Sequence, residues 1–417
     1  MTTFALSDRV HWIGAFDGRM RTFDVILNTP NGTTYNAYCV RGSEGVAVID
    51  TVKRECADQF FARLQQYAAY DEIRAVVLNH LEPDHSGCLP ELLRRAPNAQ
   101  LYISDAATGV LKGLVKDAAL PYTTVTTGSR IGLGDRSLAF LQTPYLHWPD
   151  TQCTWLPEER ILFSGDAFGC HFCDERLWND EVGDFRYAFE YYYAHIMRPF
   201  KRHVLDALAL IEPLDIAVLA PAHGPILRQD PRDYVARYRE LSTPRLHRGA
   251  RDGERTVVVF YISSYGNTQR MAEAIRDGVA EIPGLRLSVY DLEGTPVLPF
   301  VDLVEAADAV LIGSPTINGD AVKPVWDLLS SFAQIDVRGK LGGAFGSFGW
   351  SGEAVRMIED RLRGLKFRVP LGGLKVKLVP SHDEIDACRN WGRGIGEFLT
   401  GCAPPREIDF AALVGNS

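Results

Sequence analysis

The chain lacks the features that mark secreted, membrane or nucleic-acid-binding proteins. It has no basic N-terminal segment followed by an apolar stretch, and no apolar run as long as a membrane span. Its eight cysteines are scattered over 417 residues, which does not suggest a disulfide framework. Lys and Arg (44) are outnumbered by Asp and Glu (53), so no basic face is available for nucleic acid. We therefore expect a cytoplasmic protein with reduced thiols and with neither nucleic acid nor a membrane as a partner.

The length and hydrophobic content predict more than one domain. A chain of 417 residues with 46% hydrophobic residues is too long for one ordinary core. Between Thr243 and Glu254 the periodicity is lost and charge, Gly and Pro increase, which is typical of a linker. We predict one domain over residues 1–248, a second over residues 254–402, and a C-terminal tail over residues 403–417.

Four potential metal ligands follow the apolar run of residues 75–78 within a few positions. They are His80, Glu82, Asp84 and His85. The run predicts a strand, and Pro83 prevents the following loop from continuing as regular structure. Imidazoles and carboxylates held this close would repel or stay unsatisfied unless a cation lay between them. The stretch predicts a metal site, although a polar surface loop would also fit it in isolation.

Three later strand-like stretches also end just before a His or an Asp. Residues 137–141, 160–164 and 215–220 lead to His147, Asp166 and His223. If these strands belong to packed sheets, their ends meet at one edge and seven side chains converge. Seven N and O ligands are too many for one tetrahedral zinc but suit two metals that share a carboxylate, for which Asp166 is the candidate. The carboxylate of Glu82 favours iron or manganese over zinc.

The second half alternates between strand and helix patterns, which predicts a doubly wound α/β domain of flavodoxin size. Three of its loops follow strands and contain small, hydroxyl-bearing and aromatic residues. They are Ser263, Ser264, Tyr265, Gly266, Asn267 and Thr268; Ser314, Pro315, Thr316, Ile317, Asn318 and Gly319; and Ser347, Phe348, Gly349, Trp350, Ser351 and Gly352. The first suits a phosphate monoester, and the other two place amides and aromatic rings beside a planar heterocycle. No nucleoside triphosphate or dinucleotide fingerprint is present.

Taken together, these motifs resemble the flavodiiron family. Its metallo-β-lactamase-like domain carries H-x-E-x-D-H followed by H, D and H, and its FMN site contains Gly-Asn-Thr and Gly-Trp-Ser-Gly. The resemblance implies an α/β protein with an N-terminal αββα metallo-β-lactamase-like sandwich and a flavodoxin-like parallel sheet. It assigns one iron to His80, Glu82 and His147, the other to Asp84, His85 and His223, and the bridge to Asp166. In some members the residue matching His85 is swung away from the iron.

The activity that the resemblance implies is that of an oxidoreductase. FMN would pass electrons from an external donor, rubredoxin-like or another small redox protein, to the di-iron site, which would reduce O2 to water or NO to N2O. The chain carries no appended rubredoxin or flavin reductase module, so we expect a separate donor. A head-to-tail homodimer is implied, with a dimer of dimers as a larger assembly. Two alternative functions are a dinuclear metallo-hydrolase and a flavin electron shuttle. The first would give the FMN loops no role, and the second would give the metal ligands no role.

A few further residues attract functional hypotheses. Tyr193 is our candidate for a catalytic tyrosine that projects toward the metal pocket. His171 and His195 lie near the ligand loops in sequence and are candidates for hydrogen-bonding partners of the ligands. Cys170 and Cys173 form half of a zinc or rubredoxin-type site and are interpreted as structural. A run of basic residues without an acidic one is a candidate docking strip for an acidic electron donor. Its members are Arg361, Arg363, Lys366, Arg368, Lys375 and Lys377.

Overall fold

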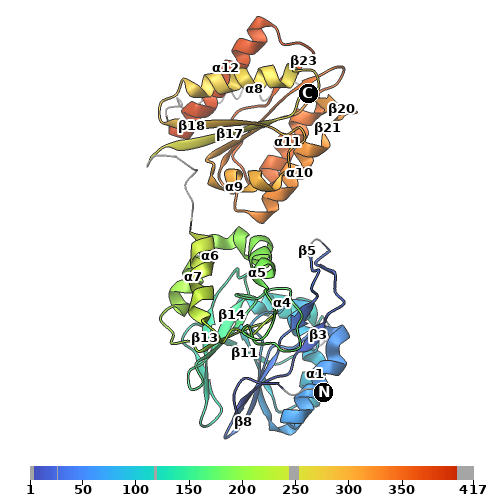
Figure 1. The fold of residues 1–417 in the computed structure, drawn as a ribbon, viewed down its shortest axis with the longest axis vertical. Helices are drawn as coiled ribbons and strands as arrows, with labels where there is room; N and C mark the ends of the chain where they lie inside the picture. The colour runs from blue at the N-terminus through green and yellow to red at the C-terminus, as the bar shows by residue number, and fades with distance from the viewer. Residues whose placement is uncertain (1–3, 26, 117–119, 244–252, 402–417) are drawn as a thin grey trace. The chain divides into compact units, whose positions relative to one another are not determined.

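The computed structural model describes residues 4–25, 27–116, 120–243 and 253–401. The chain divides into two compact units, Met1–Thr243 and Pro244–Ser417 (Figure 1). Residues 244–252 of the predicted linker and the predicted tail 403–417 lie outside the described residues. The finer domain boundaries at residues 248 and 254 stay predictions.

The N-terminal unit contains two main sheets. The seven-stranded sheet has the order β1 (Phe4–Ala5), β2 (Val10–Trp12), β7 (Tyr38–Gly42), β8 (Gly45–Ile49), β9 (Ile73–Val77), β10 (Gln100–Ser104) and β11 (Tyr122–Val125). The five-stranded sheet has the order β12 (Arg130–Gly132), β13 (Ser137–Gln142), β14 (Gln152–Leu156), β15 (Ile161–Gly165) and β16 (Val218–Pro221). β15 and β16 are parallel, whereas β14 is antiparallel to both β13 and β15, so β13, β15 and β16 end at the same edge.

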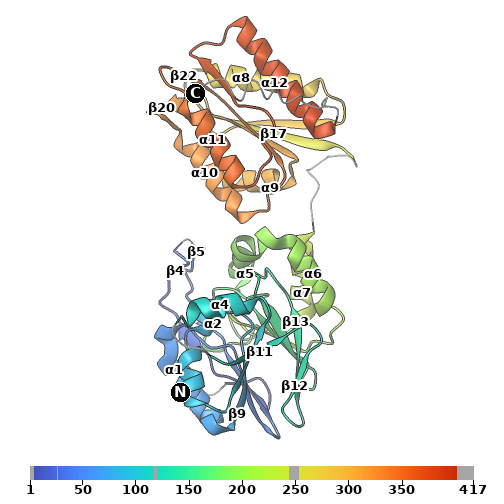
Figure 2. The same cartoon turned by 180° about the vertical axis from the view of Figure 1, so that it is seen from behind.

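Seven α-helices belong to the described part of this unit. They are α1 (Ala57–Tyr67), α2 (Pro83–Ser86), α3 (Leu89–Arg95), α4 (Ala107–Leu114), α5 (Arg186–Tyr192), α6 (Lys201–Ile211) and α7 (Pro231–Ser242). Short helical turns cover η1 (Arg54–Cys56), η2 (Tyr70–Glu72), η3 (Tyr193–Met197) and η4 (Arg198–Phe200). Figure 2 shows α1 and α4 on the side of the seven-stranded sheet, with α6 and α7 beside β13.

Side chains alternate between the two faces of each strand. The two sheets and the helices on their outer faces form four layers, with a hydrophobic core between each neighbouring pair of layers. On β8, Val46 and Val48 pack with α1, α3 and α4, whereas Ala47 and Ile49 point to the other sheet. This period of two is expected for a strand that is buried on both faces. On the five-stranded sheet, Phe163 joins the core between the sheets. Leu162 packs against α5–α7. The unit is therefore an αββα sandwich, as predicted.

The region before the first long strands differs from the prediction. The residue types of 24–27 predict a strand, but the chain forms a hairpin of β4 (Thr22–Phe23) and β5 (Leu27–Asn28). Asp24 and Val25 have φ values of 47° and 66°, which a strand cannot contain. A second small ladder pairs β3 (Ala15–Asp17) with β6 (Thr33–Tyr35).

The C-terminal unit is a doubly wound parallel sheet. Its strand order is β18 (Leu285–Asp291), β17 (Arg255–Tyr261), β19 (Ala309–Gly313), β22 (Leu341–Phe348) and β23 (Leu374–Lys377), and every neighbouring pair is parallel. The helices are α8 (Asn267–Ala280), α9 (Leu298–Ala306), α10 (Lys323–Ser331), α11 (Glu353–Gly364) and α12 (His382–Thr400), with a turn η5 (Phe332–Gln334) and a hairpin of β20 (Thr316–Ile317) and β21 (Asp320–Ala321). The sheet has one core with α9–α11 and a second core with α8 and α12.

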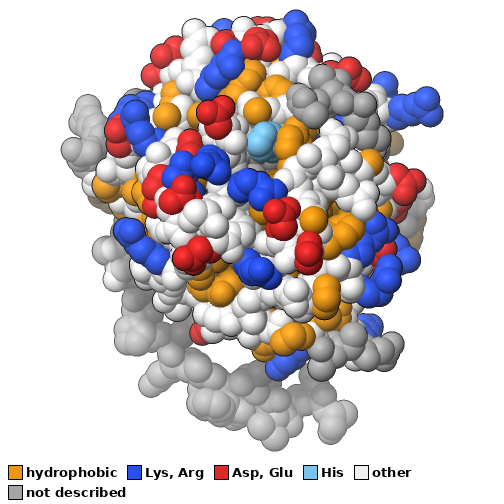
Figure 3. All heavy atoms as spheres, turned by 90° about the horizontal axis from the view of Figure 1, so that it is seen from below, with side chains coloured by type: hydrophobic (Ala, Val, Ile, Leu, Met, Phe, Trp, Pro, Cys, Tyr) orange, Lys and Arg blue, Asp and Glu red, His pale blue; other side chains and the backbone are white. Residues whose placement is uncertain are grey.

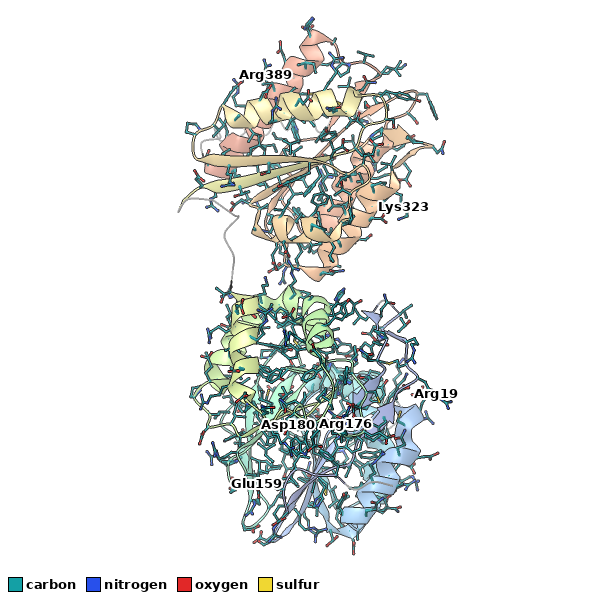
Figure 4. All side chains as sticks on the ribbon, in the orientation of Figure 1. Arg19, Glu159, Arg176, Asp180, Lys323 and Arg389 are labelled. Carbon is teal, nitrogen blue, oxygen red and sulfur yellow. The ribbon has the colours of Figure 1, made fainter. Side chains whose placement is uncertain are left out.

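Charged side chains form ion pairs at the surface that contribute little to the stability of the fold. Lys323 pairs with Asp327 across one turn of α10, and Arg228 pairs with Asp180 at 2.9 Å. Lys323 and Asp180 are labelled in Figure 4. Acidic and basic side chains are interspersed on the face drawn in Figure 3. Exposed pairs of this kind contribute about 0–1 kcal/mol each, so the buried cores dominate stability. Among the described residues, no helix combines the length and the apolar character that crossing a membrane would need.

Candidate metal centre and ligand-binding loops

The predicted metal ligands meet at one edge of the sandwich, where strands of both sheets end. His80 and Glu82 follow β9, Asp84 and His85 lie on α2, and His147, Asp166 and His223 follow β13, β15 and β16. The two sheets are joined here, because the Gln152 backbone N–H donates to the Asn79 carbonyl at 2.9 Å. The Asn79 side-chain amide also donates to the Phe163 carbonyl at 3.3 Å. These bonds hold the two sheet ends in fixed register, and the ligand loops with them.

The first ligand group consists of His80, Glu82 and His147. Glu82 Oε2 lies 3.2 Å from His80 Nε2 and 3.1 Å from His147 Nε2. The other ring nitrogen of His80, Nδ1, lies 3.0 Å from Asp150 Oδ2, which also accepts from the Leu81 N–H. A carboxylate on Nδ1 fixes the ring and directs Nε2 toward the centre, as is usual for a metal-binding histidine.

The second ligand group consists of Asp84, His85 and His223. His223 Nε2 lies 3.1 Å from Asp84 Oδ2, and His85 Nε2 lies 3.3 Å from Asp84 Oδ1. His223 Nδ1 donates to the Thr34 carbonyl at 2.8 Å, which again leaves Nε2 for the centre. The structure therefore turns His85 inward, together with the other two side chains of this group.

Asp166 lies between the two groups and offers one oxygen to each. Its Oδ2 is 3.7 Å from His80 Nε2 and 3.6 Å from His147 Nε2. Its Oδ1 is 3.3 Å from His85 Nε2 and 3.4 Å from His223 Nε2. A carboxylate in this position has the arrangement that a bridge between two metal ions requires.

Several buried ligand atoms lack a hydrogen bond within the part of the chain that the structure describes. They are both carboxylate oxygens of Asp84, Nε2 of His85 and Oδ2 of Asp166. Leaving buried polar atoms unpaired costs about 1–3 kcal/mol each, and more for charged groups. They face one another at short range without hydrogen-bond geometry, so their lone pairs converge on a common space. This donor set of nitrogen and carboxylate oxygen fits two iron ions.

The charges of the buried ligand side chains compensate one another. Burial opposes the charged form of His80, but hydrogen bonds with Asp150 and Glu82 outweigh it and raise its pKa to about 9. Burial likewise opposes ionisation of Asp84, but the nearby His85 and His223 lower its pKa to about 2. For Asp166 the neighbouring histidines also outweigh burial and hold the pKa well below the ordinary value.

The structure differs from the prediction at Tyr193. Its hydroxyl lies 2.7 Å from Ser242 Oγ, and its ring is an edge-to-face neighbour of Tyr238 within the core under α7. The preceding residue, Tyr192, donates its hydroxyl to Asp166 Oδ1 at 3.0 Å. Successive helical residues point about 100° apart, so a triple-tyrosine run cannot show which ring faces the centre.

The other predicted neighbours of the centre separate into two kinds. The His171 ring lies 5.3 Å from that of His223, and its Nδ1 is 3.0 Å from Thr33 Oγ1. His195 instead has its Nδ1 2.8 Å from the Tyr191 carbonyl and packs on the Tyr191 ring.

Cys170 and Cys173 are free thiols, and burial raises the pKa of Cys173 to about 11.

Sequence reasoning missed the residues that orient the ligands. Asp150 follows His147 by three positions, and this spacing in a ligand loop was the available signal. Thr34 acts through its backbone carbonyl, so its side-chain type carries no signal. The sequence analysis selected Tyr193, and not Tyr192, as the tyrosine that faces the metal centre.

The three predicted loops of the C-terminal unit lie at one edge of its sheet. They follow β17, β19 and β22, which are adjacent and parallel, so their carboxyl ends coincide. Thr268 Oγ1 lies 2.9 Å from Ser347 Oγ and links the first loop to the third. The second loop is the β20–β21 hairpin, in which Asn318 and Gly319 have φ values of 53° and 76°. Such a turn is typical of an Asn-Gly pair.

The loops combine unpaired polar groups with exposed rings. Ser263 Oγ is buried and lacks a hydrogen-bond partner among the described residues. It precedes the N-terminus of α8, whose free N–H groups suit a phosphate. Tyr265 and Trp350 are 91% and 79% exposed, although large aromatic side chains are usually buried. An aromatic heterocycle bound between these loops would cover such rings, so the residues fit a flavin mononucleotide.

Comparisons with known proteins assign each unit of the chain to a known family. The family model "ODP family beta lactamase" matches residues 33–224, and the flavodoxin model matches residues 259–392. The chain is 58% identical to the type A flavoprotein fprA of Rhodobacter capsulatus, over 98% of this chain and 94% of that protein. It is 33% identical to a nitric oxide reductase of Moorella thermoacetica, over 94% and 97% of the two chains. Rubredoxin oxygen:oxidoreductase of Desulfovibrio gigas has a similar solved structure, with a TM-score of 0.67, 28% identity, and coverage of 96% and 99%.

The fold and the two sites thus define a two-unit flavoprotein with a dinuclear metal centre. The chain belongs to the flavodiiron family, the type A flavoproteins.

Proposed function

We propose that Asp166 bridges two iron ions, one held by His80, Glu82 and His147 and the other by Asp84, His85 and His223, and that the three loops of the C-terminal unit hold FMN. The protein is an oxidoreductase that passes electrons through FMN to a non-haem di-iron site, where O2 is reduced to water or NO to N2O. The observation that carries this proposal is the orientation of Asp166, with one carboxylate oxygen toward each group of ligands.

When bound, two ferrous ions supply electrons and open coordination positions to a diatomic molecule. The chain's own residues prepare the place for them. Asp150 and the Thr34 carbonyl fix the rings of His80 and His223, and Tyr192 holds the Oδ1 side of Asp166. Since these ligands are almost fully buried, bulk water is kept from the centre.

The electrons come, in this proposal, from a separate small redox protein. The similar protein of Desulfovibrio gigas is a rubredoxin oxygen:oxidoreductase, which supports a rubredoxin-like donor. A head-to-tail homodimer would bring the FMN of one subunit beside the irons of the other, and a dimer of dimers would repeat this contact. We place the protein in the cytoplasm, because the described cysteines are free thiols, as expected in a reducing compartment.

Metal analysis combined with a visible spectrum tests this function. We expect about two irons and about one FMN per chain, as the donor set and the loops require. Zinc without flavin would contradict the proposal, as would flavin without metal. Anaerobic stopped-flow mixing of the reduced protein with O2 and with NO then identifies the substrate, since the flavin and iron absorbance is reoxidised faster by the preferred one.

A further inference from the structure

The loop that carries His223 is held by one short stretch of the chain, from Thr34 to Asn36. The His223 Nδ1–H donates to the Thr34 carbonyl at 2.8 Å. The Thr34 hydroxyl oxygen accepts from the Gly224 N–H at 2.8 Å. The Asn36 N–H donates to the Ala222 carbonyl at 2.7 Å. This stretch therefore contacts both the imidazole ring of the ligand and the backbone on either side of it.

The side-chain amide of Asn36 holds the loop on both sides of His223. Its Nδ2 lies 2.9 Å from the Pro221 carbonyl oxygen and 2.9 Å from that of Gly224. The Trp12 indole N–H donates to Asn36 Oδ1 at 2.9 Å. An indole N–H can only donate and a carbonyl can only accept, so these partners fix which atom of the amide is oxygen and which is nitrogen. Both amide hydrogens are thus used by the two carbonyls that flank the ligand.

These contacts are closed to water. Asn36, Trp12 and His223 are each 1% exposed, so solvent cannot replace the amide as a donor. A buried carbonyl without a partner costs about 1–3 kcal/mol, and the loss of the amide donors would leave two of them. The loop would move to find new partners, and the His223 ring would move with it.

The first ligand group has a different support. His80 is oriented by the Asp150 carboxylate, which also accepts from the Leu81 N–H. Within the described residues, none of the hydrogen bonds of Asn36 reaches this first group. The two groups share the proposed bridge Asp166, but separate parts of the chain orient their histidines.

We propose that Asn36, oriented by Trp12, is a positioning residue for the second metal position alone, and that it decides whether the protein holds two irons or one. The inference rests on the proposed function, because it presupposes the two bridged iron positions. Without His223 in place, the second position has only the two ligands of α2 and the bridge. The first position keeps its own three ligands and the bridge.

Asn36→Asp is the sharpest test, because it keeps the size and shape of the side chain. It replaces the two N–H donors with an oxygen that faces two carbonyl oxygens, so the loop is repelled instead of held. Thr34→Val is a milder companion that keeps the branched shape and the backbone carbonyl but removes the hydroxyl bonded to Gly224. Tyr193→Phe is the matched control, since it removes one buried hydrogen bond of the same unit outside the His223 loop.

The full-length protein with FMN bound is titrated anaerobically with ferrous iron, and iron and FMN per chain are measured after gel filtration. We expect wild type and Tyr193→Phe to hold about two irons per chain. In Asn36→Asp the second iron should bind about 10–100-fold more weakly, and in Thr34→Val the effect should be smaller. FMN content should be the same in every variant, and a higher concentration of ferrous iron should restore the second iron.

Two further measurements identify which position is empty. After oxidation, a lone high-spin ferric ion gives an electron paramagnetic resonance signal, whereas a coupled ferric pair gives none, so Asn36→Asp should gain this signal. Anomalous diffraction at the iron edge should then place its remaining iron in the first position. Asp150→Ala is the reciprocal variant: it removes the carboxylate behind His80 and should weaken the first position instead.

Several outcomes would overturn the role of Asn36. Equal loss of both irons from Asn36→Asp, or a remaining iron in the second position, would show that the residue does not act on that position alone. Iron loss from Tyr193→Phe as well would assign the effect to general destabilisation. If Asn36→Asp does not fold, an unchanged second iron in Thr34→Val contradicts the inference. Wild-type protein without a second iron would contradict the proposed function itself, which keeps the two failures distinct.

Discussion

Tyr192 and Tyr193 are neighbours in the chain, but their side chains contact different parts of the structure. Tyr192 bonds to Asp166, and Tyr193 to Ser242 under α7. Removing the Tyr192 hydroxyl should free one oxygen of the proposed bridge, so we expect Tyr192→Phe to reduce iron retention or turnover by about 10–100-fold. Iron content after dialysis against a chelator and the turnover number measure this.

Tyr193→Phe is the matched control at this scale. It removes one buried hydroxyl of the same kind, and we expect it to lower the free energy of unfolding by about 1 kcal/mol without loss of iron. If Tyr193→Phe lost iron and Tyr192→Phe did not, the assignment of the two tyrosines would be reversed.

His80 makes the stability of the ion-free protein depend on pH. Its pKa of about 9 lies above the ordinary value of 6.5, so the folded chain binds the proton more tightly than the unfolded chain. The resulting stability is fully present below pH 6.5 and is lost as the pH rises through 9. We expect the free energy of unfolding of chelator-treated protein to fall by up to about 1.4 kcal/mol per pH unit for this one proton.

Denaturant titrations at pH 6.5, 7.5, 8.5 and 9.5 measure this dependence. In the iron-loaded protein the metal takes the place of the proton on His80, so the free energy of unfolding should not fall between pH 6.5 and 9.5. Loading iron at pH 7 should therefore release protons. An identical pH dependence with and without iron would show that His80 is not among the groups that the metal deprotonates.

At the scale of elements, the contact between α8 and α12 depends on glycine. Figures 1 and 2 show these helices side by side on one face of the C-terminal sheet. A Cβ on Gly278 of α8 would lie 1.8 Å from the Arg389 carbonyl oxygen of α12, so the backbones approach more closely than any side chain allows. We expect Gly278→Ala to destabilise the C-terminal unit by about 1–3 kcal/mol, measured by thermal release of FMN fluorescence.

Gly364→Ala is the control for this substitution. Gly364 ends α11, and a Cβ there would have no heavy atom within 4 Å. Alanine should therefore be neutral or stabilise by up to about 1 kcal/mol. Equal destabilisation by both variants would mean that the loss at Gly278 does not come from the helix contact.

At the scale of the whole molecule, the two units have separate cores. The described core residues of one unit do not recur in a core of the other, so each unit should respond to its own cofactor. Removing iron should lower the unfolding temperature of the N-terminal unit, because unpaired ligand charges are left buried there. The temperature at which FMN is released should stay the same.

Differential scanning calorimetry together with flavin fluorescence separates these two transitions. Re-adding ferrous iron anaerobically should restore the first transition without affecting the second. If iron removal shifted the temperatures of both transitions equally, the two units would unfold as one cooperative body.

The agreement between sequence and structure follows the range of the interactions. The amphipathic pattern of residues 57–67 predicts a helix, and α1 has those bounds, because this period is encoded within one stretch. The seven predicted ligand positions lie together in the structure because each lies just after a strand. The hairpin at Asp24 is not evident from the sequence, since Asp and Val do not signal two left-handed residues in succession. The Tyr192 contact was missed because helix rotation is set by packing.

The amino-acid sequence by itself determined the class of the protein: residue types at fixed distances after apolar strands define the metal chemistry, and three loops define the flavin site. Only the tertiary structure decided which oxygen of Asp166 faces which ligand group, that Tyr192 reaches it, and that the basic run splits between opposite ends of β22. The physical reason is that strand and helix periods are local, whereas convergence at a sheet edge depends on strand order and on the packing of layers.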